Sequence, residues 1–275
     1  MVTGKTALLR AQRRWADAYG VHYDARGCVR ALAHNLRAPL DESSLTELQR
    51  GSELKAGVTQ PARAFSLCSS AALVVNVFAY WRGRDQTPLL AALGVGGPGG
   101  TRLELEVPLP TGLPGDPPTV DVALHRPDGR LVAIESKFAE WLAPRPRGQR
   151  VFKDKYFAGG IRVWEAAALP LCQALAEDLQ QGREKLKHLN APQVLKHALG
   201  LAVNGLRTST LVYLYYDRPE REGKTHRAEV DRIAARLQPE VDMRVTTYQA
   251  LFAALRAAPG LERDYVDYLA RRYFA

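Results

Sequence analysis

Cysteine is scarce in this sequence, and the few cysteines follow no disulfide or metal-binding pattern. The chain has only three cysteines, Cys28, Cys68 and Cys172, which are far apart and form no Cys-X-X-Cys pair. An odd number of widely spaced cysteines supports neither a disulfide framework nor a zinc site. This use of cysteine agrees with a reducing cytoplasm.

Long apolar runs are also missing. No uncharged apolar run reaches the ~20 residues that a bilayer-spanning helix needs, and the first residues lack the apolar stretch of a signal peptide. We therefore expect a cytoplasmic protein with no membrane partner.

Two glycine-containing segments do not fit the nucleotide-binding motifs they suggest. Gly4-Lys5-Thr6 has no glycine five residues before its own, so it is not a phosphate loop. The run GVGGPGG at 94–100 leads into an expected strand, whereas a dinucleotide-binding fingerprint opens a helix. Both segments are better explained as structural.

The composition is that of a globular protein with a sizeable core. Of 275 residues, 46% are hydrophobic and 24% are charged, and we see neither an internal repeat nor a clear linker. Lysine and arginine number 38 against 29 acidic residues, a net charge of +9. This balance suits a polyanionic partner such as nucleic acid, although ribosome-associated, membrane-surface and merely soluble proteins share it.

One segment of the chain favours a β-hairpin. Two runs, Thr119–His125 and Leu131–Phe138, are rich in β-branched and apolar residues, and Arg-Pro-Asp-Gly-Arg stands between them. Pro127 suits the second position of a type I turn, and Gly129 suits the left-handed residue of a following bulge.

The turn fixes which residues face each other. If Arg126 faces Arg130, counting back along both strands places Asp121 opposite Glu135. Because side chains alternate along a strand, Asp121, Glu135 and Lys137 share one face. The even-numbered residues then form the core face: Val120, Val122, Leu124, Val132, Ile134 and Phe138.

Two opposed carboxylates need a compensating charge. Directly opposed residues have Cβ atoms roughly 4.5 to 5.5 Å apart, and like charges there are destabilising. A divalent cation such as Mg²⁺ resolves the repulsion, because it takes oxygen ligands from one or two carboxylates and completes its shell with water and substrate phosphate. Lys137 points at the same place, where an ammonium can position or help deprotonate an attacking water.

These residues match a known pattern. Asp121, followed by Glu135-Ser136-Lys137, resembles the PD-(D/E)XK nuclease superfamily, with Asp121 as the first acid and Glu-X-Lys as the second half of the motif. The sequence departs from the pattern because Val120, not proline, precedes Asp121. The alternative is a surface hairpin whose charged face is merely solvated.

The expected order of elements agrees with that superfamily. Amphipathic helices are predicted over Thr6–Tyr19 and Val29–Leu36, and a polar stretch follows. Residues 71–81 are predicted as a buried helix capped by serine, and residues 102–107 as a strand before the hairpin. Further helices are predicted over 171–189, 192–206 and 227–237, further strands over 210–216 and 242–248, and helices at the end.

The fold class that follows is α/β, with a restriction-endonuclease-like core in which a mixed central sheet is flanked by helices. We expect a single domain over residues 1–275, with a core at about 45–250. A helical addition at 1–44 and helices at 251–275 complete it.

The resemblance implies further site residues. A glutamine on the helix after the hairpin reaches the site in several branches, and Gln193 occupies a comparable place in a polar stripe with Lys196, His197 and Gly200. The alternative is that this stripe is merely solvated. Gly51-Ser52-Glu53-Leu54 followed by SSAALVVNVF resembles the start of a bacterial group in which an acid from the first helix region holds metal-bound water, and Glu53 is the best positional match. The alternative is a plain surface glutamate. The backbone carbonyl of Ser136 is a further expected metal ligand.

Several other residues are weighed here as site residues or as structural or surface residues. Glu104 or Glu106 could be a third acid, or could lie on an exposed edge. Glu140 could support the site from behind, and His125 lies too far along its strand, about 13 Å from Asp121, to be a ligand. Asn76, in an apolar helix, is expected to be a hydrogen-bonded structural amide.

A basic cluster follows the hairpin, with Phe152, Tyr156 and Phe157 among the charges. Charge runs are usually solvated, but basic residues with interleaved aromatics also hold single-stranded or distorted nucleic acid. The nucleic-acid-binding residues predicted here are Arg145, Arg147, Arg150, Lys153 and Lys155, together with Lys196.

The function predicted from the resemblance is hydrolysis of DNA phosphodiester bonds by a Mg²⁺-dependent endonuclease in which Mn²⁺ can substitute. Asp121 and Glu135 would hold the metal, and Lys137 and Gln193 would complete the catalytic set. The alternatives are a weak or inactive nuclease-fold protein that binds nucleic acid, and a basic interaction protein unrelated to nucleases. DNA is favoured over RNA, and a homodimer is left open.

Overall fold

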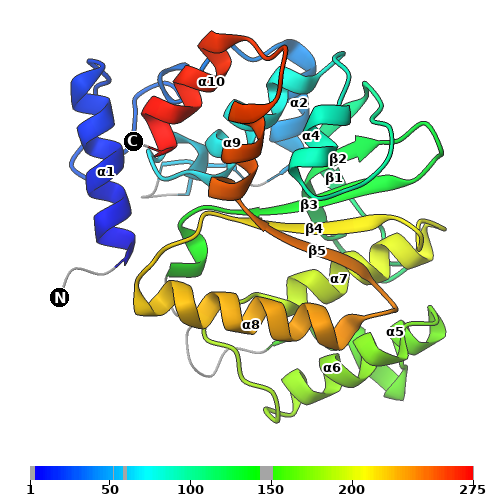
Figure 1. Ribbon diagram of the computed structural model, residues 1–275. Coiled ribbons are helices and arrows are strands. Elements are labelled where there is room, and N and C mark those ends of the chain that lie inside the picture. The colour runs from blue at the N-terminus through cyan, green and yellow to red at the C-terminus, as the bar shows by residue number, and fades with distance from the viewer. Residues whose placement is uncertain (1–3, 52, 58–60, 143–150, 275) are drawn as a thin grey trace.

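One mixed sheet, with strand order β1-β2-β3-β4-β5, crosses the middle of the chain (Figure 1). The computed structural model describes residues 4–51, 53–57, 61–142 and 151–274. The first three strands are antiparallel to one another, and β4 and β5 run parallel to β3. The strands are β1 (Leu103–Pro108), β2 (Thr119–His125), β3 (Leu131–Lys137), β4 (Thr210–Tyr215) and β5 (Asp242–Thr247).

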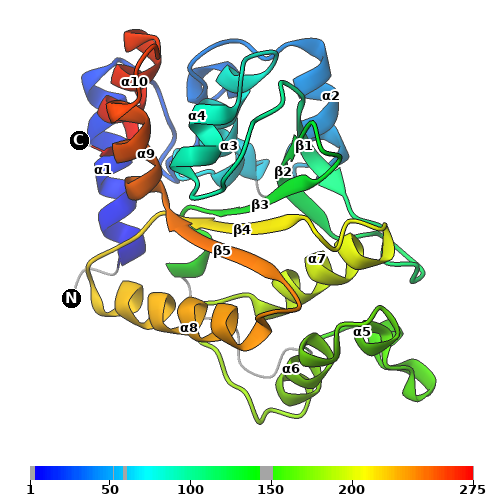
Figure 2. The same ribbon diagram turned by 45° about the vertical axis from the view of Figure 1, so that its right-hand side comes forward.

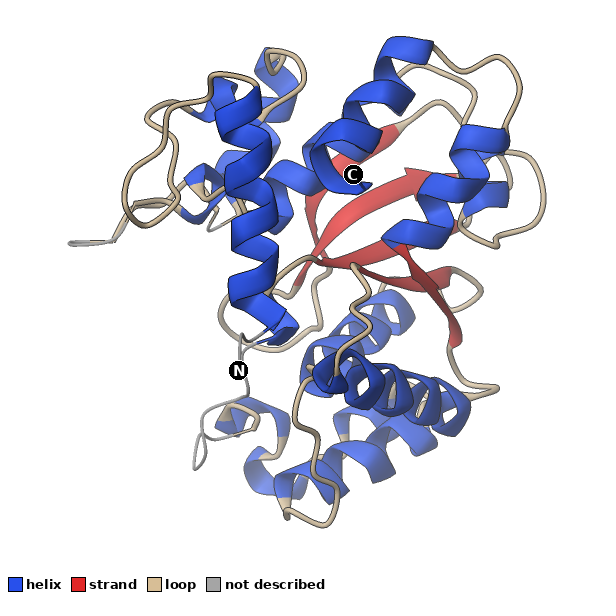
Figure 3. Cartoon of the chain, turned by 60° about the vertical axis from the view of Figure 1, so that its left-hand side comes forward, coloured by secondary structure: helices blue, strands red, loops and turns tan. Residues whose placement is uncertain are grey.

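Helices cover both faces of this sheet (Figures 1 to 3). The first layer comprises α2 (Glu42–Arg50), α3 (Ser70–Phe78), α4 (Thr87–Ala92), α9 (Tyr248–Ala257) and α10 (Arg263–Leu269). The second comprises α5 (Val163–Ala166), α6 (Pro170–Gln180), α7 (Ala191–Val203) and α8 (Arg221–Leu237). Helix α1 (Gly4–Ala18) stands beside the C-terminal turn (Ala270–Phe274). The predicted α/β fold class is confirmed.

The hairpin has the predicted register. Ala123 pairs with Ala133, and Leu124 pairs with Val132. The turn forms as the sequence indicates: Arg126 N donates to the carbonyl of Arg130 at 3.0 Å, and Gly129 adopts a φ of 77°. A left-handed φ costs least at glycine, so this turn holds the two strands in register.

Only half of the predicted burial pattern holds, because both faces of the sheet are buried. The hydrophobic core between the sheet and the first helix layer, called the first core, contains the expected residues Val122, Leu124, Val132, Ile134 and Phe138. The opposite face is not solvated, because Ala123, Ala133 and Leu131 pack against the second helix layer, α5 to α8, in what we call the second core. Val120 was predicted for the first core but lies in the second. A sheet with parallel strands is usually covered on both sides, and the predicted one-sided core did not allow for this.

Helix α3 begins as predicted at a serine cap, with the Ser69 side chain accepting from Ala72 N at 3.1 Å. Asn76 is the buried structural amide that the sequence suggests. Its Oδ1 accepts from Arg37 N at 2.6 Å, and its Nδ2 donates to the Asn35 carbonyl and the Tyr273 hydroxyl. This amide therefore joins the segment before α2 to the C-terminal turn.

Two predicted helices are wrong in whole or in part. Residues 29–36 contain only a short 3₁₀ turn, Leu32–Asn35, because the buried Asn35 side chain donates to the carbonyls of Ala64 and Ser66. Such tertiary contacts override helix propensity. The polar stretch that follows contains α2, which begins at an Asp41 cap.

The helix predicted over residues 171–189 ends at Gln180. Gly182 follows with a φ of 72°. The Glu229 carboxylate of α8 then accepts from the backbone nitrogens of Lys187, His188 and Leu189, at 2.7 to 2.9 Å. Side-chain acceptance of these three backbone donors replaces the helical hydrogen bonds.

The two ends of the described chain pack together. The Gln12 side chain on α1 donates to the carbonyl of Arg272 at 3.0 Å.

The division of the chain into a core and two terminal additions stays a prediction.

Removing the Asn76 amide should destabilise the fold. Asn76→Ala leaves buried backbone groups without partners, so we expect the free energy of unfolding to fall by about 3 kcal/mol. Asn204→Ala removes an exposed amide and should cost less than about 1 kcal/mol. Urea denaturation of both variants measures the difference, and equal losses would contradict the structural role of Asn76.

Candidate active site

A cavity of about 740 Å³ opens where β1, β2 and β3 approach the start of α7. It is polar and carries both acids and bases. The lining residues used below are Arg50, Gly51, Glu53, Lys55, Arg63, Glu106, Thr119, Asp121, Ser136, Lys137, Glu140, Asn190 and Gln193.

Asp121 enters this cavity because β2 and β3 part at this point. Their ladder ends at the pair Val122 and Ile134, one residue before Asp121 and Glu135 would pair. The Asp121 carboxylate instead accepts a hydrogen bond of 2.6 Å from Ser136 N. A side-chain oxygen thus takes over a backbone contact and is fixed at the edge of β3.

Glu106 reaches the cavity from β1. Leu105 pairs with Val122 and Val107 pairs with Val120, so Glu106 stands opposite Asp121 between those two pairs. The Glu106 backbone has a φ of 50°, which is rare for a side-chain-bearing residue. The regular alternation of side chains between the two faces of the sheet breaks at Glu106, because Leu105 packs in the first core and Val107, two residues later, packs against the second.

The neighbouring chain makes room for Glu106. A Cβ at Gly51 would lie 2.4 Å from Glu106 Oε2, so a larger residue here would push the carboxylate out of its present position. The Glu106 residue is 8% exposed, and its carboxylate has no hydrogen bond or ion pair within the described residues. The sequence named Glu104 and Glu106 as alternatives, and the structure places Glu106 in the cavity.

Glu135 lies behind the cavity. It is 1% exposed and forms an ion pair with Lys137. On the other side, its Oε2 lies 3.5 Å from His197 Nδ1 on α7. Glu106, Asp121 and Glu135 thus occupy corresponding positions on three adjacent strands.

Burial and mutual repulsion perturb these acids. Burial, and after it the Glu135 carboxylate, raise the pKa of Asp121 well above its usual range. Burial, followed by repulsion from Glu53 and Glu135, raises the pKa of Glu106 to about 7. Each carboxylate therefore resists ionisation while no cation offsets its charge.

Lys137 supplies part of that positive charge. Its side chain is 15% exposed and lines the cavity beside Asp121. Burial alone would lower the pKa of Lys137, but Glu135 and Asp121 raise it above its usual range. The side chain is therefore a fixed ammonium at neutral pH and is not a free base.

His197 is the residue to which the sequence argument gave no role. It is fully buried, and burial lowers its pKa against the opposing effect of Glu135. Its Nε2 lies 3.2 Å from the Thr119 carbonyl, which can only accept, so Nε2 carries the hydrogen in the neutral ring. The lone pair on Nδ1 then faces the Glu135 carboxylate, and a proton or cation is needed between them.

The stripe on α7 is not solvated. Gln193 lines the cavity, and its Oε1 accepts from the Asn190 side chain at 3.0 Å. A Cβ at Gly200 would lie 2.6 Å from Leu109 Cβ, so glycine lets α7 approach the strands closely. His197 lies between these two positions on the buried side. Lys196, predicted to bind nucleic acid, is half-buried and does not line the cavity.

Glu53 also reaches the cavity, as the resemblance implied. It forms an ion pair with Arg63 at 3.0 Å, and burial raises its pKa. The carbonyl of Ser136, the third expected metal ligand, accepts a hydrogen bond from the Ser70 hydroxyl at 3.2 Å. That contact leaves the carbonyl one further lone pair.

Glu140 and Glu104, the other two acids named in the sequence analysis, lie in different places. Glu140 lines the cavity and accepts from Phe138 N at 2.8 Å, so it supports the end of β3. Glu104 lies elsewhere, paired with Arg102 and with His125 at 2.6 and 2.7 Å. These pairs make Glu104 a surface acid on β1.

Only part of the predicted basic cluster lies within the described residues, so its binding of nucleic acid stays a prediction. Arg145, Arg147 and Arg150 lie outside the described residues. Lys153 is exposed, and the Lys155 ammonium donates to the Pro114 carbonyl at 2.6 Å.

The aromatic residues of this cluster are not available to stack on bases. Phe152 and Tyr156 are each 3% exposed, and both pack on Trp164 in the second core. Phe157 is half-buried against the same tryptophan. The predicted interleaving of charges with exposed rings is therefore wrong, because these rings contribute to hydrophobic packing.

The donor set suits a hard cation held by few protein ligands. Among the residues described, no three His, Cys, Asp or Glu side chains form a ready metal cluster. Mg²⁺ does not need one, because one or two carboxylates with waters and phosphate suffice. The Glu106 carboxylate, which lines the cavity, and the buried Glu135 oxygens, which make no hydrogen bond, are the groups whose charge such an ion would offset.

The raised pKa of Glu106 predicts a pH-dependent stability in the presence of a chelator. An acid with a folded pKa of about 7 and a usual value of 4.5 binds more protons when folded, so its stabilisation is complete below pH 4.5 and lost as pH rises through 7. Glu106→Gln should therefore be more stable than wild type at pH 8 by about 3 kcal/mol, and gain nothing at pH 4.5.

Urea denaturation at the two pH values measures this difference. Glu104→Gln, on the same strand, is the matched control and should gain no stability at pH 8. If Glu106→Gln gained nothing at pH 8, the carboxylate would not experience the repulsion described above.

Comparison with known proteins gives one family. The family described as "Restriction Endonuclease associating with ARP" matches residues 29–274. No curated protein and no solved structure matches the chain. Within the described residues, no helix has both the length and the apolar character needed to cross a membrane.

The match covers most of the chain and includes every residue that lines the cavity. The mixed sheet with helices on both faces is that of a restriction-endonuclease-like core, as the motif indicates. The chain therefore belongs to the family of restriction endonucleases described as associating with ARP, and its function is nuclease-like.

Proposed function

We propose that this protein is a metal-dependent endonuclease that hydrolyses phosphodiester bonds of DNA. The observation that carries the proposal is the meeting of Glu106, Asp121 and Lys137 in one cavity, with Glu135 directly behind them. Acids on adjacent strands, next to a fixed ammonium, are suited to phosphoryl chemistry.

Mg²⁺, or Mn²⁺ in its place, is the proposed cofactor. Asp121 and Glu106 would hold it from the cavity, with Glu135 and the Ser136 carbonyl as further oxygen donors. When bound, such an ion stabilises charge on phosphate oxygens and on the leaving group. The charge would also offset the repulsion that raises the pKa values of Asp121 and Glu106.

Lys137 positions the attacking water in this proposal. Its ammonium is held by Glu135, and its own carbonyl accepts from Tyr216 N at 2.8 Å. Both ends of the residue are therefore fixed, which limits the motion of the ammonium within the cavity. A fixed cation can orient a water and stabilise negative charge on phosphate without reorganising.

The walls of the cavity supply the remaining contacts. Gln193, at the start of α7, offers an amide for a phosphate oxygen or for the water. Arg50 and Lys55 bring positive charge to the opposite wall, where the DNA backbone would lie. Recognition of DNA rather than RNA and assembly as a homodimer both remain proposals.

One observation favours a second candidate, a nuclease-fold protein that binds nucleic acid without cutting it. The ion pair with Lys137 holds Glu135 outside the lining of the cavity. In an active enzyme, that ion pair must open or share its charge when metal and phosphate enter. The cleavage assay below separates the two candidates.

Purified protein incubated with plasmid and Mg²⁺ or Mn²⁺ should nick or linearise the DNA. Lys137→Ala and Glu135→Ala should each lower the cleavage rate by at least about a hundredfold, because one loses the water-positioning cation and the other loses a carboxylate of the site. Lys224→Ala, which removes an exposed lysine on α8, is the control and should cleave like wild type.

Both variants must keep a wild-type far-ultraviolet circular dichroism spectrum for the comparison to hold. Wild-type cleavage by both variants would refute the mechanism. Metal-independent binding without cleavage by the wild type would favour the second candidate.

A further inference from the structure

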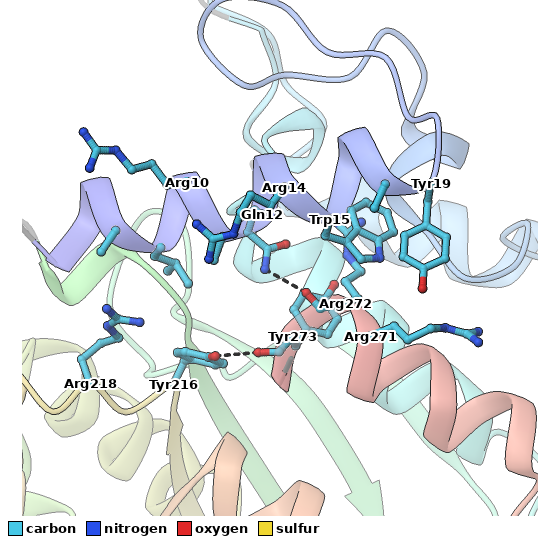
Figure 4. Close-up of a pocket in the computed structure, with 14 residues that line it drawn as sticks. Arg10, Gln12, Arg14, Trp15, Tyr19, Tyr216, Arg218, Arg271, Arg272 and Tyr273 are labelled. Atoms are coloured by element: carbon cyan, nitrogen blue, oxygen red, sulfur yellow. Dashed lines mark hydrogen bonds between the residues drawn. The ribbon is translucent and has the colours of Figure 1, made fainter.

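A second cavity, of about 670 Å³, lies between α1, the C-terminal turn and the segment after β4 (Figure 4). We call it the arginine pocket. Its walls come from both ends of the chain. Its polar and aromatic lining residues are Arg10, Gln12, Arg14, Trp15, Tyr19, Tyr216, Arg218, Arg271, Arg272 and Tyr273.

The charge of the arginine pocket is of one sign. Five arginines line it, and no aspartate or glutamate is among its described lining residues. Arg218 is partly neutralised by Glu220 at 2.5 Å, outside the pocket. Arg14 makes no ion pair within the described chain. Figure 4 shows the guanidinium groups of Arg14 and Arg218 on facing walls.

Aromatic rings stand beside these charges. Trp15 on α1 and Tyr19, in the turn directly after α1, have ring centroids 5.9 Å apart, and Tyr19 is 53% exposed. The Arg271 guanidinium lies 5.8 Å from the centre of the Tyr19 ring. An exposed ring next to a guanidinium provides a surface on which a planar base can stack.

Buried polar atoms in the wall lack partners. Gln12 is 2% exposed, and its Oε1 accepts no hydrogen bond. Arg272 is also 2% exposed. It donates to Asn35 and stacks on Trp15, but its Nε and Nη1 make no hydrogen bond. Such buried groups are costly to leave unsatisfied.

The arginine pocket adjoins the end of the strand that carries Lys137. Tyr216, in its floor, donates its backbone N–H to the Lys137 carbonyl. Phe138, the next residue, packs edge to face on Tyr216 and Tyr273, with centroid distances of 5.1 and 5.7 Å. The floor of this pocket therefore contacts the chain at Lys137 and at the residue directly after it.

We propose that the arginine pocket binds a nucleotide unit of single-stranded nucleic acid, with arginines on the phosphates and a base against Trp15 and Tyr19. Pockets of about 300 to 1,000 Å³ enclose small ligands, so this one has room for a nucleotide. Only the choice of a strand over a free nucleotide rests on the proposed nuclease function, because the strand would continue toward Lys137.

Fluorescence anisotropy, measured in the presence of a chelator, tests the binding of single-stranded nucleic acid without any cleavage of it. The probe is a short fluorescein-labelled single-stranded oligothymidylate, compared with the same strand in a duplex and with adenosine monophosphate as competitor. Arg14→Gln with Arg271→Gln should weaken binding of the single strand at least about tenfold and flatten its salt dependence by roughly 0.7 for each lost phosphate contact.

The control is Arg13→Gln with Arg256→Gln, which removes the same charge from α1 and α9 outside the pocket. Arg13 lies on another side of α1, where it donates to the Ala25 carbonyl. This double variant should bind the single strand like wild type, and both double variants should bind the duplex equally. Matching thermal melts establish that both are folded.

Three results are informative. Selective loss of single-strand binding in the pocket variant supports the proposal. Competition by adenosine monophosphate at similar affinity, lost in the same variant, supports the pocket and identifies a free nucleotide as the ligand. Equal binding of the single strand by the two double variants overturns it. Because no metal is present, failure of the protein to cleave DNA would leave each of these results unchanged.

Discussion

The burial of neighbouring carboxylates, and their mutual repulsion, is the constraint on which the candidate site depends. Glu106, Asp121 and Glu135 occupy corresponding positions on β1, β2 and β3. Burial raises the pKa of the first two, and their neighbours add to the shift. The surrounding structure offsets the repulsion locally, with Lys137 paired to Glu135 and Ser136 N donating to Asp121. The compensation is incomplete at Glu106, and this residue therefore marks where a cation would enter.

The rest of the fold keeps these groups in place. The sheet is buried on both faces, so the site is a local opening at the point where β2 and β3 part. Gly51 and Gly200 let the neighbouring chain and α7 approach closely. Helix α7 brings Gln193 to the cavity and His197 to Glu135. The C-terminal ends of β3 and β4 lead from this site to the arginine pocket, because Tyr216 N in its wall donates to the Lys137 carbonyl.

The sequence predicted the elements that depend on local rules. The turn with Pro127 and Gly129 determined the hairpin register, and that register placed Asp121 near Glu135. The serine cap located the start of α3. Glu106 could not be distinguished from Glu104, because regular alternation puts both on one face and only the left-handed backbone at Glu106 separates them. The role of His197 and the burial of Phe152 and Tyr156 depend on distant packing partners, which periodicity does not reveal.

Thermal melting of wild type and Asp121→Asn, each in chelator and with Mn²⁺, tests the shared site most directly. A cation that binds only the folded state raises stability by about 2.7 kcal/mol at a hundred times its Kd. The wild type should therefore melt higher with Mn²⁺. Asp121→Asn should melt higher than wild type in chelator and lose most of the response to Mn²⁺, whereas Asp231→Asn should behave like wild type. A lower melting temperature of Asp121→Asn in chelator, together with a full response to Mn²⁺, would contradict the account.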